Sequence, residues 1–119
     1  MAELTRQDVI RILAITDSPR LAGVDLSGLD LSSLNFYGAD LIRANLSGAN
    51  LKFAYLREAR LEDANLKGAN LMFANLKNAN LNDANLAGAN LTGANLKDAS
   101  MFHSNLTGAV LDQAKGIEK

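Results

Sequence analysis

The side chains best suited to chemistry are few, and they do not cluster in the sequence. His103 is the only histidine, and cysteine is absent. Metal sites are built from several histidine, cysteine or carboxylate ligands that converge on one point. The sequence also offers no nucleophile with a matching base and no phosphate-binding loop. We therefore expect no catalytic residue, no cofactor and no metal, and hence no enzyme.

Charged side chains recur in small groups of opposite sign. A basic row follows a 20-residue spacing, with an acidic residue directly after two of its members: Arg57, Lys77 and Lys97, with Glu58 and Asp98. A second group is acidic and comprises Glu62, Asp63 and Asp83. The net charge is −1, whereas recognition or mimicry of a polyanion requires many charges of one sign. We interpret both groups as solvated faces and expect no nucleic-acid partner.

These residues are positioned by a five-residue repeat. A large apolar residue recurs at every fifth position from Leu26 to Leu111, with Phe36 and Met101 as the only residues other than leucine. The residue two positions earlier is alanine throughout 39–99. Five matches neither the helical nor the strand period, so a common core requires the chain to turn within every repeat.

A longer period indicates how many sides each coil has. Glycine recurs every 20 residues at positions 28, 48, 68, 88 and 108. Four repeats per coil are therefore predicted, with successive coils stacked about 4.8 Å apart. The leucines assigned to the middle of the core are Leu46, Leu51, Leu56, Leu61, Leu66, Leu71, Leu76, Leu81, Leu86 and Leu91.

The residues at the predicted corners and before each leucine also form series. The corner residue, two positions after the leucine, is often Gly, Asp or Asn, as the third position of a type II turn favours. Five corners lack that preference and are expected to use another turn: Arg43, Phe53, Glu58, Phe73 and His103. Asparagines that precede the leucines, such as Asn45 and Asn65, are expected to hydrogen-bond along the stack.

The N-terminal segment differs from the repeat. Residues 4–16 are predicted to form an amphipathic helix with a capping box at Thr5 and Asp8 and an inner face of Val9, Ile12, Leu13 and Thr16. We assign residues 1–20 to a helical cap and connection, 21–113 to the repeat and 114–119 to a tail. No segment resembles a secretory signal or approaches the about 20 apolar residues of a membrane span. A cytoplasmic protein with no membrane partner is expected.

The repeat A-[DN]-L-x-x resembles the pentapeptide repeat family over about three quarters of the chain. The resemblance implies an all-β solenoid, a right-handed quadrilateral β-helix with the leucine and alanine inside. Members of this family include proteins that protect type II topoisomerases by mimicking duplex DNA. Many other members, numerous in cyanobacteria, have no assigned role.

Apolar residues in outward positions are the first candidates for a binding surface. Phe53, Met72 and Phe73 are predicted to share one side, with Tyr55 around the corner and Tyr37 alone. Large exposed apolar patches tend to mark interaction sites. The competing interpretation is that Phe53 and Phe73 stack on each other and cover their corners.

The C-terminal coil is the second candidate surface. Gly116 stands where the repeat calls for leucine, and no amphipathic segment follows. Four core residues are therefore expected to lie at an open end: Leu96, Met101, Leu106 and Leu111. An open end exposes apolar surface and unpaired backbone, so a homodimer through this coil is one hypothesis and a tail folded over it is the other.

The role favoured by these patterns is a non-enzymatic protein-binding or scaffold module with an unknown protein partner. A DNA-mimicking topoisomerase protector and a self-assembling structural rod are the alternatives.

Overall fold

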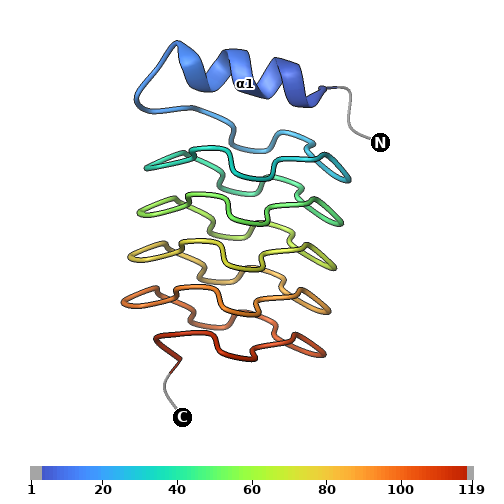
Figure 1. Ribbon diagram of the computed structural model, residues 1–119, viewed down its shortest axis with the longest axis vertical. Coiled ribbons are helices and arrows are strands. Elements are labelled where there is room, and N and C mark those ends of the chain that lie inside the picture. Colours follow the sequence, from blue (N-terminus) through green and yellow to red (C-terminus); the bar gives the residue numbers. More distant parts are fainter. Residues whose placement is uncertain (1–3, 118–119) are drawn as a thin grey trace.

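The chain forms a rod of stacked four-sided coils with one helix across its N-terminal end (Figure 1). The computed structural model describes residues 4–117, so residues 1–3 of the predicted cap and 118–119 of the predicted tail lie outside it. Every β-bridge is parallel and joins residues 20 positions apart, from Arg20↔Asp40 to Asn95↔Lys115. The prediction of four sides is confirmed. The ladder also continues past residue 113, where the sequence was expected to leave the repeat.

Hydrogen bonds between coils use three backbone N–H groups of each repeat. In the repeat around Leu46, the Leu46 N–H donates to Asn65 O at 2.7 Å and the Gly48 N–H to Lys67 O at 2.9 Å. In the next coil, the Asn65 N–H donates back to Ala44 O at 3.0 Å. Each coil is thus held to the next by bonds that run in both directions along the rod.

The remaining two N–H groups of the repeat are bonded within their own coil. The Ala49 N–H donates to Leu46 O at 3.1 Å and closes the turn. The Ser47 N–H donates to the side-chain Oδ1 of Asn45 at 3.1 Å. This Asx turn recurs along the asparagine series, Asn50 included, and the predicted bonds from one amide to the next along the stack are not found among residues 4–117. A bond along the stack does occur between Asn50 Nδ2 and Asp30 Oδ1, at 3.4 Å.

All corners share one backbone conformation, which contradicts the expectation of two turn types. The five residues expected to differ (Arg43, Phe53, Glu58, Phe73 and His103) have φ between 58° and 61°, close to the 64–72° of the glycine corners from 28 to 108. A left-handed conformation costs an L-residue roughly 1–2 kcal/mol. The bonds between coils and across the turn fix every corner in the same way, so this local preference is overridden.

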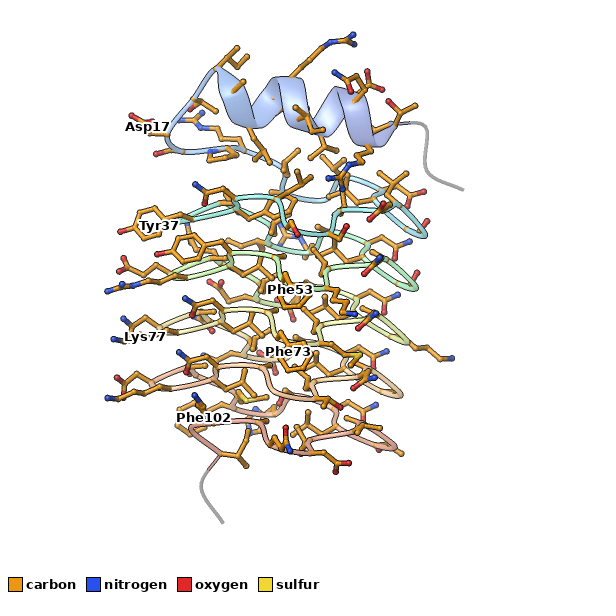
Figure 2. The ribbon with its side chains drawn as sticks, in the orientation of Figure 1. Asp17, Tyr37, Phe53, Phe73, Lys77 and Phe102 are labelled. Atoms are coloured by element: carbon orange, nitrogen blue, oxygen red, sulfur yellow. The ribbon has the colours of Figure 1, made fainter. Side chains whose placement is uncertain are left out.

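The interior is a column of leucine and alanine. The ten leucines assigned to it, from Leu46 to Leu91, are each at most 1% exposed. Leu21 and Phe36 extend the column toward the N-terminus, and no polar or charged residue among 4–117 is fully buried. Burial of each leucine contributes roughly 1.5–3 kcal/mol before entropy is counted. Outward side chains, such as Lys77 and Phe102, surround the rod (Figure 2).

The helix α1 spans Arg6–Ala14 and is shorter than the predicted 4–16. Its capping box is confirmed: the Asp8 N–H donates to Thr5 Oγ1 at 3.2 Å, and the Thr5 N–H donates to Asp8 Oδ2 at 2.9 Å. Val9 is fully buried and Ile12 packs against the core. Thr16, expected on the inner face, lies beyond the helix and is exposed. Within residues 4–117, no helix is long and apolar enough to cross a membrane.

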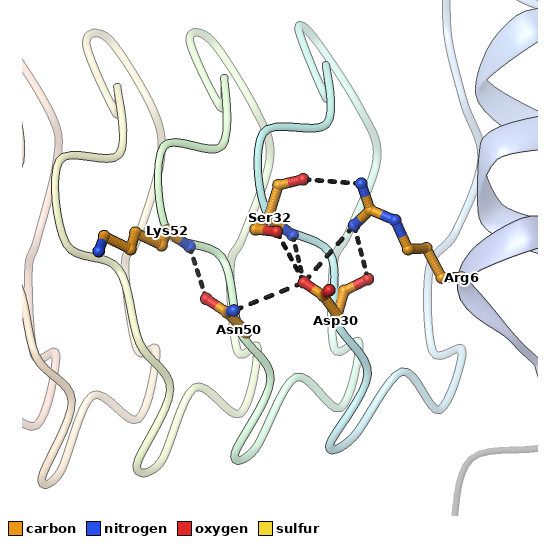
Figure 3. Close-up of polar contacts among 5 residues, drawn as sticks. All are labelled: Arg6, Asp30, Ser32, Asn50 and Lys52. Atoms are coloured by element: carbon orange, nitrogen blue, oxygen red, sulfur yellow. Dashed lines mark hydrogen bonds and ion pairs between the residues drawn. The ribbon is translucent and has the colours of Figure 1, made fainter.

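Arg6 attaches α1 to the first coil (Figure 3). Its Nη1 and Nη2 donate to Asp30 O at 2.9 Å and Ser32 O at 3.1 Å, and Nη1 lies 3.5 Å from Asp30 Oδ1. The Ser32 hydroxyl and N–H, aided by the Arg6 charge, lower the pKa of the Asp30 carboxyl. In the next coil, the equivalent carbonyls accept hydrogen bonds from backbone N–H groups of the first coil. The Arg6 guanidinium therefore supplies to the first coil the donors that a preceding coil would supply.

The C-terminal coil is partly closed. Leu96 is only 1% exposed, so its assignment to an open end is wrong. The Leu96 N–H donates to Lys115 O at 2.8 Å, and Ile117 packs against the core from the same side. Met101, Leu106 and Leu111 are partly buried.

We expect Leu71→Asp to remove most of the stability of the rod. It places a carboxylate in a fully enclosed leucine site and should lower the free energy of unfolding by more than about 4 kcal/mol. Thermal unfolding followed by circular dichroism measures the change, and Lys67→Asp, at an exposed outward position, serves as the control. An unchanged melting temperature for Leu71→Asp would contradict the inward assignment.

Arg6→Met should lower the free energy of unfolding by about 1–2 kcal/mol, because a charged donor of two hydrogen bonds is lost. Arg11→Met is the matched control on the same helix, since Arg11 makes only an exposed contact of 3.6 Å with Asp8. The control should change stability by less than about 0.5 kcal/mol. Urea denaturation compares the two variants, and equal losses would show that Arg6 does not anchor α1.

Candidate functional site

Two phenylalanines, at the same corner of successive coils, form an outward aromatic pair (Figure 2). The rings of Phe53 and Phe73 stack with centroids 5.3 Å apart and an interplanar angle of 15°. The stack was one of the two interpretations drawn from the sequence. Both residues nevertheless remain well exposed, at 55% and 43%.

Two neighbouring residues contact this stack. Lys52 Nζ lies 5.5 Å from the Phe53 ring centroid. The Phe73 ring lies against Gly93, where an added Cβ would come within 2.5 Å of the ring. The Phe53 N–H donates to Met72 O at 2.9 Å, which fixes the backbone between the two corners. We call Phe53, Phe73, Lys52 and Gly93 the phenylalanine corner.

Tyr55 belongs to a separate aromatic pair. It was expected beside the phenylalanines with Tyr37 alone, but the rings of Tyr37 and Tyr55 stack with centroids 6.2 Å apart and an interplanar angle of 22°. Asn35 is bridged to Tyr55 in the next coil, and Tyr37 lies two residues after Asn35. The bridge therefore brings Tyr55, which precedes a core residue, close to Tyr37, which follows one. Tyr37 and Tyr55 are 18 positions apart, and this spacing, two less than one coil, is the feature of the sequence from which the pair could have been predicted.

Phe102 is the most exposed aromatic residue, at 73%. Its coil has Ser100 in place of the usual asparagine, and Asn82 of the preceding coil supplies the missing acceptor. Asn82 Oδ1 accepts from the Phe102 N–H at 2.9 Å and from Ser100 Oγ at 2.6 Å. This departure from the repeat is therefore compensated structurally.

The charged groups form dispersed pairs. Arg57 Nε lies 3.7 Å from Glu58 Oε2, and His103 Nδ1 lies 3.7 Å from Asp83 Oδ1. All four side chains are substantially exposed, so each pair contributes little. Among residues 4–117, no three His, Cys, Asp or Glu side chains gather closely enough to hold a metal ion.

The structure also contains a groove that could not be predicted from the repeat pattern. It is open, has a volume of about 380 Å³, and lies between the end of α1 and the first coil. Its lining residues are Leu13, Thr16, Asp17, Pro19, Asn35 and Tyr37. The groove depends on how the connection after the helix crosses the coil, and the repeat pattern does not specify that path.

Comparison with known proteins gives a consistent family match. The sequence profile of the family described as "Pentapeptide repeats" matches in eight copies, over residues 20–48, 44–83 and 79–115. Among curated proteins, the sequence comparison finds no significant match.

Solved structures with the same fold come from cyanobacteria and a plant. The pentapeptide repeat protein Rfr23 from Cyanothece 51142 is 44% identical with a TM-score of 0.73, over 78% of this chain and 62% of its own. HetL, involved in heterocyst differentiation regulation in Nostoc sp. strain PCC 7120, is 30% identical with a TM-score of 0.84, over 94% and 49%. A pentapeptide repeat protein from the Arabidopsis thaliana thylakoid lumen is 33% identical with a TM-score of 0.76, over 91% and 70%. The chain thus spans about half of HetL and under two thirds of Rfr23.

Gly93→Ala should displace the Phe73 ring, because the new methyl group occupies its position. Gly88→Ala is a matched control: both glycines have φ of 68°, but no atom lies within 4 Å of a Cβ at position 88. Both variants should lose about 1 kcal/mol from backbone strain. Only Gly93→Ala should shift the ring proton resonances of Phe53 and Phe73 in NMR spectra. Unchanged resonances would mean that the ring does not rest on Gly93.

Proposed function

The chain belongs to the pentapeptide repeat family, and from this premise we propose that it is a non-enzymatic protein-binding or scaffold module whose partner contacts the phenylalanine corner. The solved relatives imply a right-handed quadrilateral β-helix. Because that framework buries the leucine and alanine of each repeat, the outward residues are the ones available for recognition.

The observation that carries this proposal is that Phe53 and Phe73 stay 55% and 43% exposed although they stack. Each also has a left-handed backbone that costs an L-residue roughly 1–2 kcal/mol. An aromatic stack contributes only about 0.5–1.5 kcal/mol beyond burial. Arg43 and Glu58 carry the same backbone cost at their corners, so what sets the phenylalanines apart is the apolar area that stacking leaves exposed, and burial of that area against a partner would stabilise the complex.

A partner surface on this side extends to Met72, which is half-buried on the outward side of the same coil as Phe73. Aromatic residues and methionine are enriched at the core of protein interfaces. Tyr55, assigned to this surface from the sequence, stacks on Tyr37 instead and is left out of the proposed contact.

A non-enzymatic role is supported by the packing of the interior and by the dispersed titratable groups. The coil interior is filled by leucine and alanine, and the charged side chains among residues 4–117 lie singly or in separate pairs such as Arg57 with Glu58. Catalysis by proton transfer or nucleophilic attack requires such groups to converge on a substrate.

The topoisomerase-protector alternative is not favoured. Duplex DNA is mimicked by a long surface of one sign, since its partners bind through many phosphate contacts. The net charge of −1 and the pairing of Arg57 with Glu58 do not provide such a surface.

We propose that α1 caps the N-terminal end, since Val9 is buried and Arg6 bonds to the first coil. Self-association through the C-terminal coil is supported by the partial exposure of Met101, Leu106 and Leu111. The expected cytoplasmic location stays a prediction.

Affinity capture from a lysate of the source organism tests the phenylalanine corner. The bait is the tagged chain, either unchanged or with Phe53→Ser and Phe73→Ser combined. It is mixed with an untagged, isotope-labelled copy of the chain, whose recovery reports self-association. Serine is tolerated at this corner series, since Ser33 occupies it with φ of 62°. The expected result is a protein recovered with the unchanged bait and lost with the double variant.

Phe102→Ser is the matched control, because it removes an exposed phenylalanine elsewhere on the rod. It should leave the captured protein unchanged. Recovery of only the labelled copy would favour the self-assembling rod, and an identical set of proteins with both baits would contradict the proposed surface.

A further inference from the structure

We propose that the groove between α1 and the first coil binds an arginine side chain of a partner polypeptide. The site is separate from the phenylalanine corner and does not depend on the function proposed for it. Three observations support it: the carbonyls of Asn35 and Tyr37, which accept no hydrogen bond among residues 4–117, the bonding of Arg6 to the equivalent carbonyls on the adjacent side, and a carboxylate in the groove.

The direction of the backbone bonds leaves acceptors at the start of the rod. On each side of a coil, the carbonyls before and after the core residue point toward the preceding coil and accept from it. Tyr55 O and Arg57 O, for example, accept from the N–H groups of Phe36 and Gly38 at 2.7 and 3.0 Å. The first coil has no coil before it, so its corresponding carbonyls need other donors.

Arg6 shows what satisfies such a pair. On the side that contains Leu31, its guanidinium donates to Asp30 O and Ser32 O at 2.9 and 3.1 Å (Figure 3). The two nitrogens of one planar group therefore bond to two carbonyls that are two residues apart. A guanidinium suits this geometry because its donors form a fixed fork.

The next side, which contains Phe36, presents the same pair without a donor. Its two carbonyls belong to Asn35 and Tyr37, and no hydrogen bond to either is found among residues 4–117. Both residues line the groove. The helix ends at Ala14, and the connection that follows runs past this side without supplying a donor.

The groove has the charge and walls that an arginine side chain requires. Asp17 and the Thr16 hydroxyl line it together with Leu13 and Pro19. Asp17 lies above Tyr37 on the same edge of the molecule (Figure 2). We assign the carboxylate and the two carbonyls to the guanidinium, and the apolar walls to the methylene stem.

The exposed ring of Tyr37, at 45%, adds a surface on which a guanidinium can stack. Its stack with Tyr55 holds it beside the groove. A lysine would be weaker here, since a single ammonium cannot bond to both carbonyls as a fork.

NMR titration of the full chain tests the site. The probes are the blocked tripeptides Gly-Arg-Gly and Gly-citrulline-Gly, which differ in charge but hardly in shape, and guanidinium chloride. The expected result is a saturable shift of the backbone amides of residues 35–38 and of Asp17 with the arginine peptide. Citrulline should cause no saturable shift, and guanidinium should bind more weakly because it lacks the stem.

Two variants complete the test. Asp17→Asn should weaken binding of the arginine peptide about twofold to fivefold, the range expected for one exposed ion pair. Asp112→Asn, an exposed carboxylate in the last coil, should leave it unchanged. Equal binding of the citrulline peptide, equal binding of free guanidinium, shifts centred elsewhere on the rod, or an unaffected Asp17→Asn would each overturn the proposal.

Discussion

The structure depends on the demand that every backbone N–H of the repeat find an acceptor. Three of the five bond to a neighbouring coil, one closes the turn, and the fifth bonds to an asparagine or aspartate side chain in most repeats. This requirement explains why the residue before each leucine is so often asparagine. An unpaired buried amide is costly, and where Ser100 replaces the asparagine, Asn82 of the preceding coil accepts from the Phe102 N–H instead. The leucine column stabilises the rod, but the hydrogen bonds determine its shape.

The same demand separates what the sequence could predict from what it could not. The inward positions follow from a strict period of five, and the four sides follow from the glycines spaced 20 apart. The prediction of two turn types at the corners was wrong because it was based on the conformational preference of each residue separately. At Phe53 and Arg43 the bonds between coils override the preference of the side chain. The predicted role of asparagine was wrong for a related reason. The backbone N–H two residues later lies closer to the asparagine side chain than the next amide along the stack does, so an Asx turn forms instead.

The candidate sites show a second limit on prediction. The stack of Phe53 on Phe73 was predictable because the two residues are 20 positions, or one whole coil, apart, so that one lies directly over the other. The groove at Asp17 was not predictable, because it is formed by the connection between α1 and the first coil, which follows no period. At the N-terminal end of the rod, the carbonyls of the first coil have no preceding coil, and Arg6 donates to two of them, which the repeat itself cannot do.

The bridges between residues 20 apart also restrict how such a chain can change in length. Duplication of one five-residue unit preserves the buried pattern, yet it rotates every later residue onto the next side of the rod. If it fell between Phe53 and Phe73, the two rings would stand on different corners and their stack would be lost. A duplication of four units adds one coil and leaves every outward column in line. The core therefore tolerates growth in steps of five, whereas a surface built across several coils survives only growth in steps of 20.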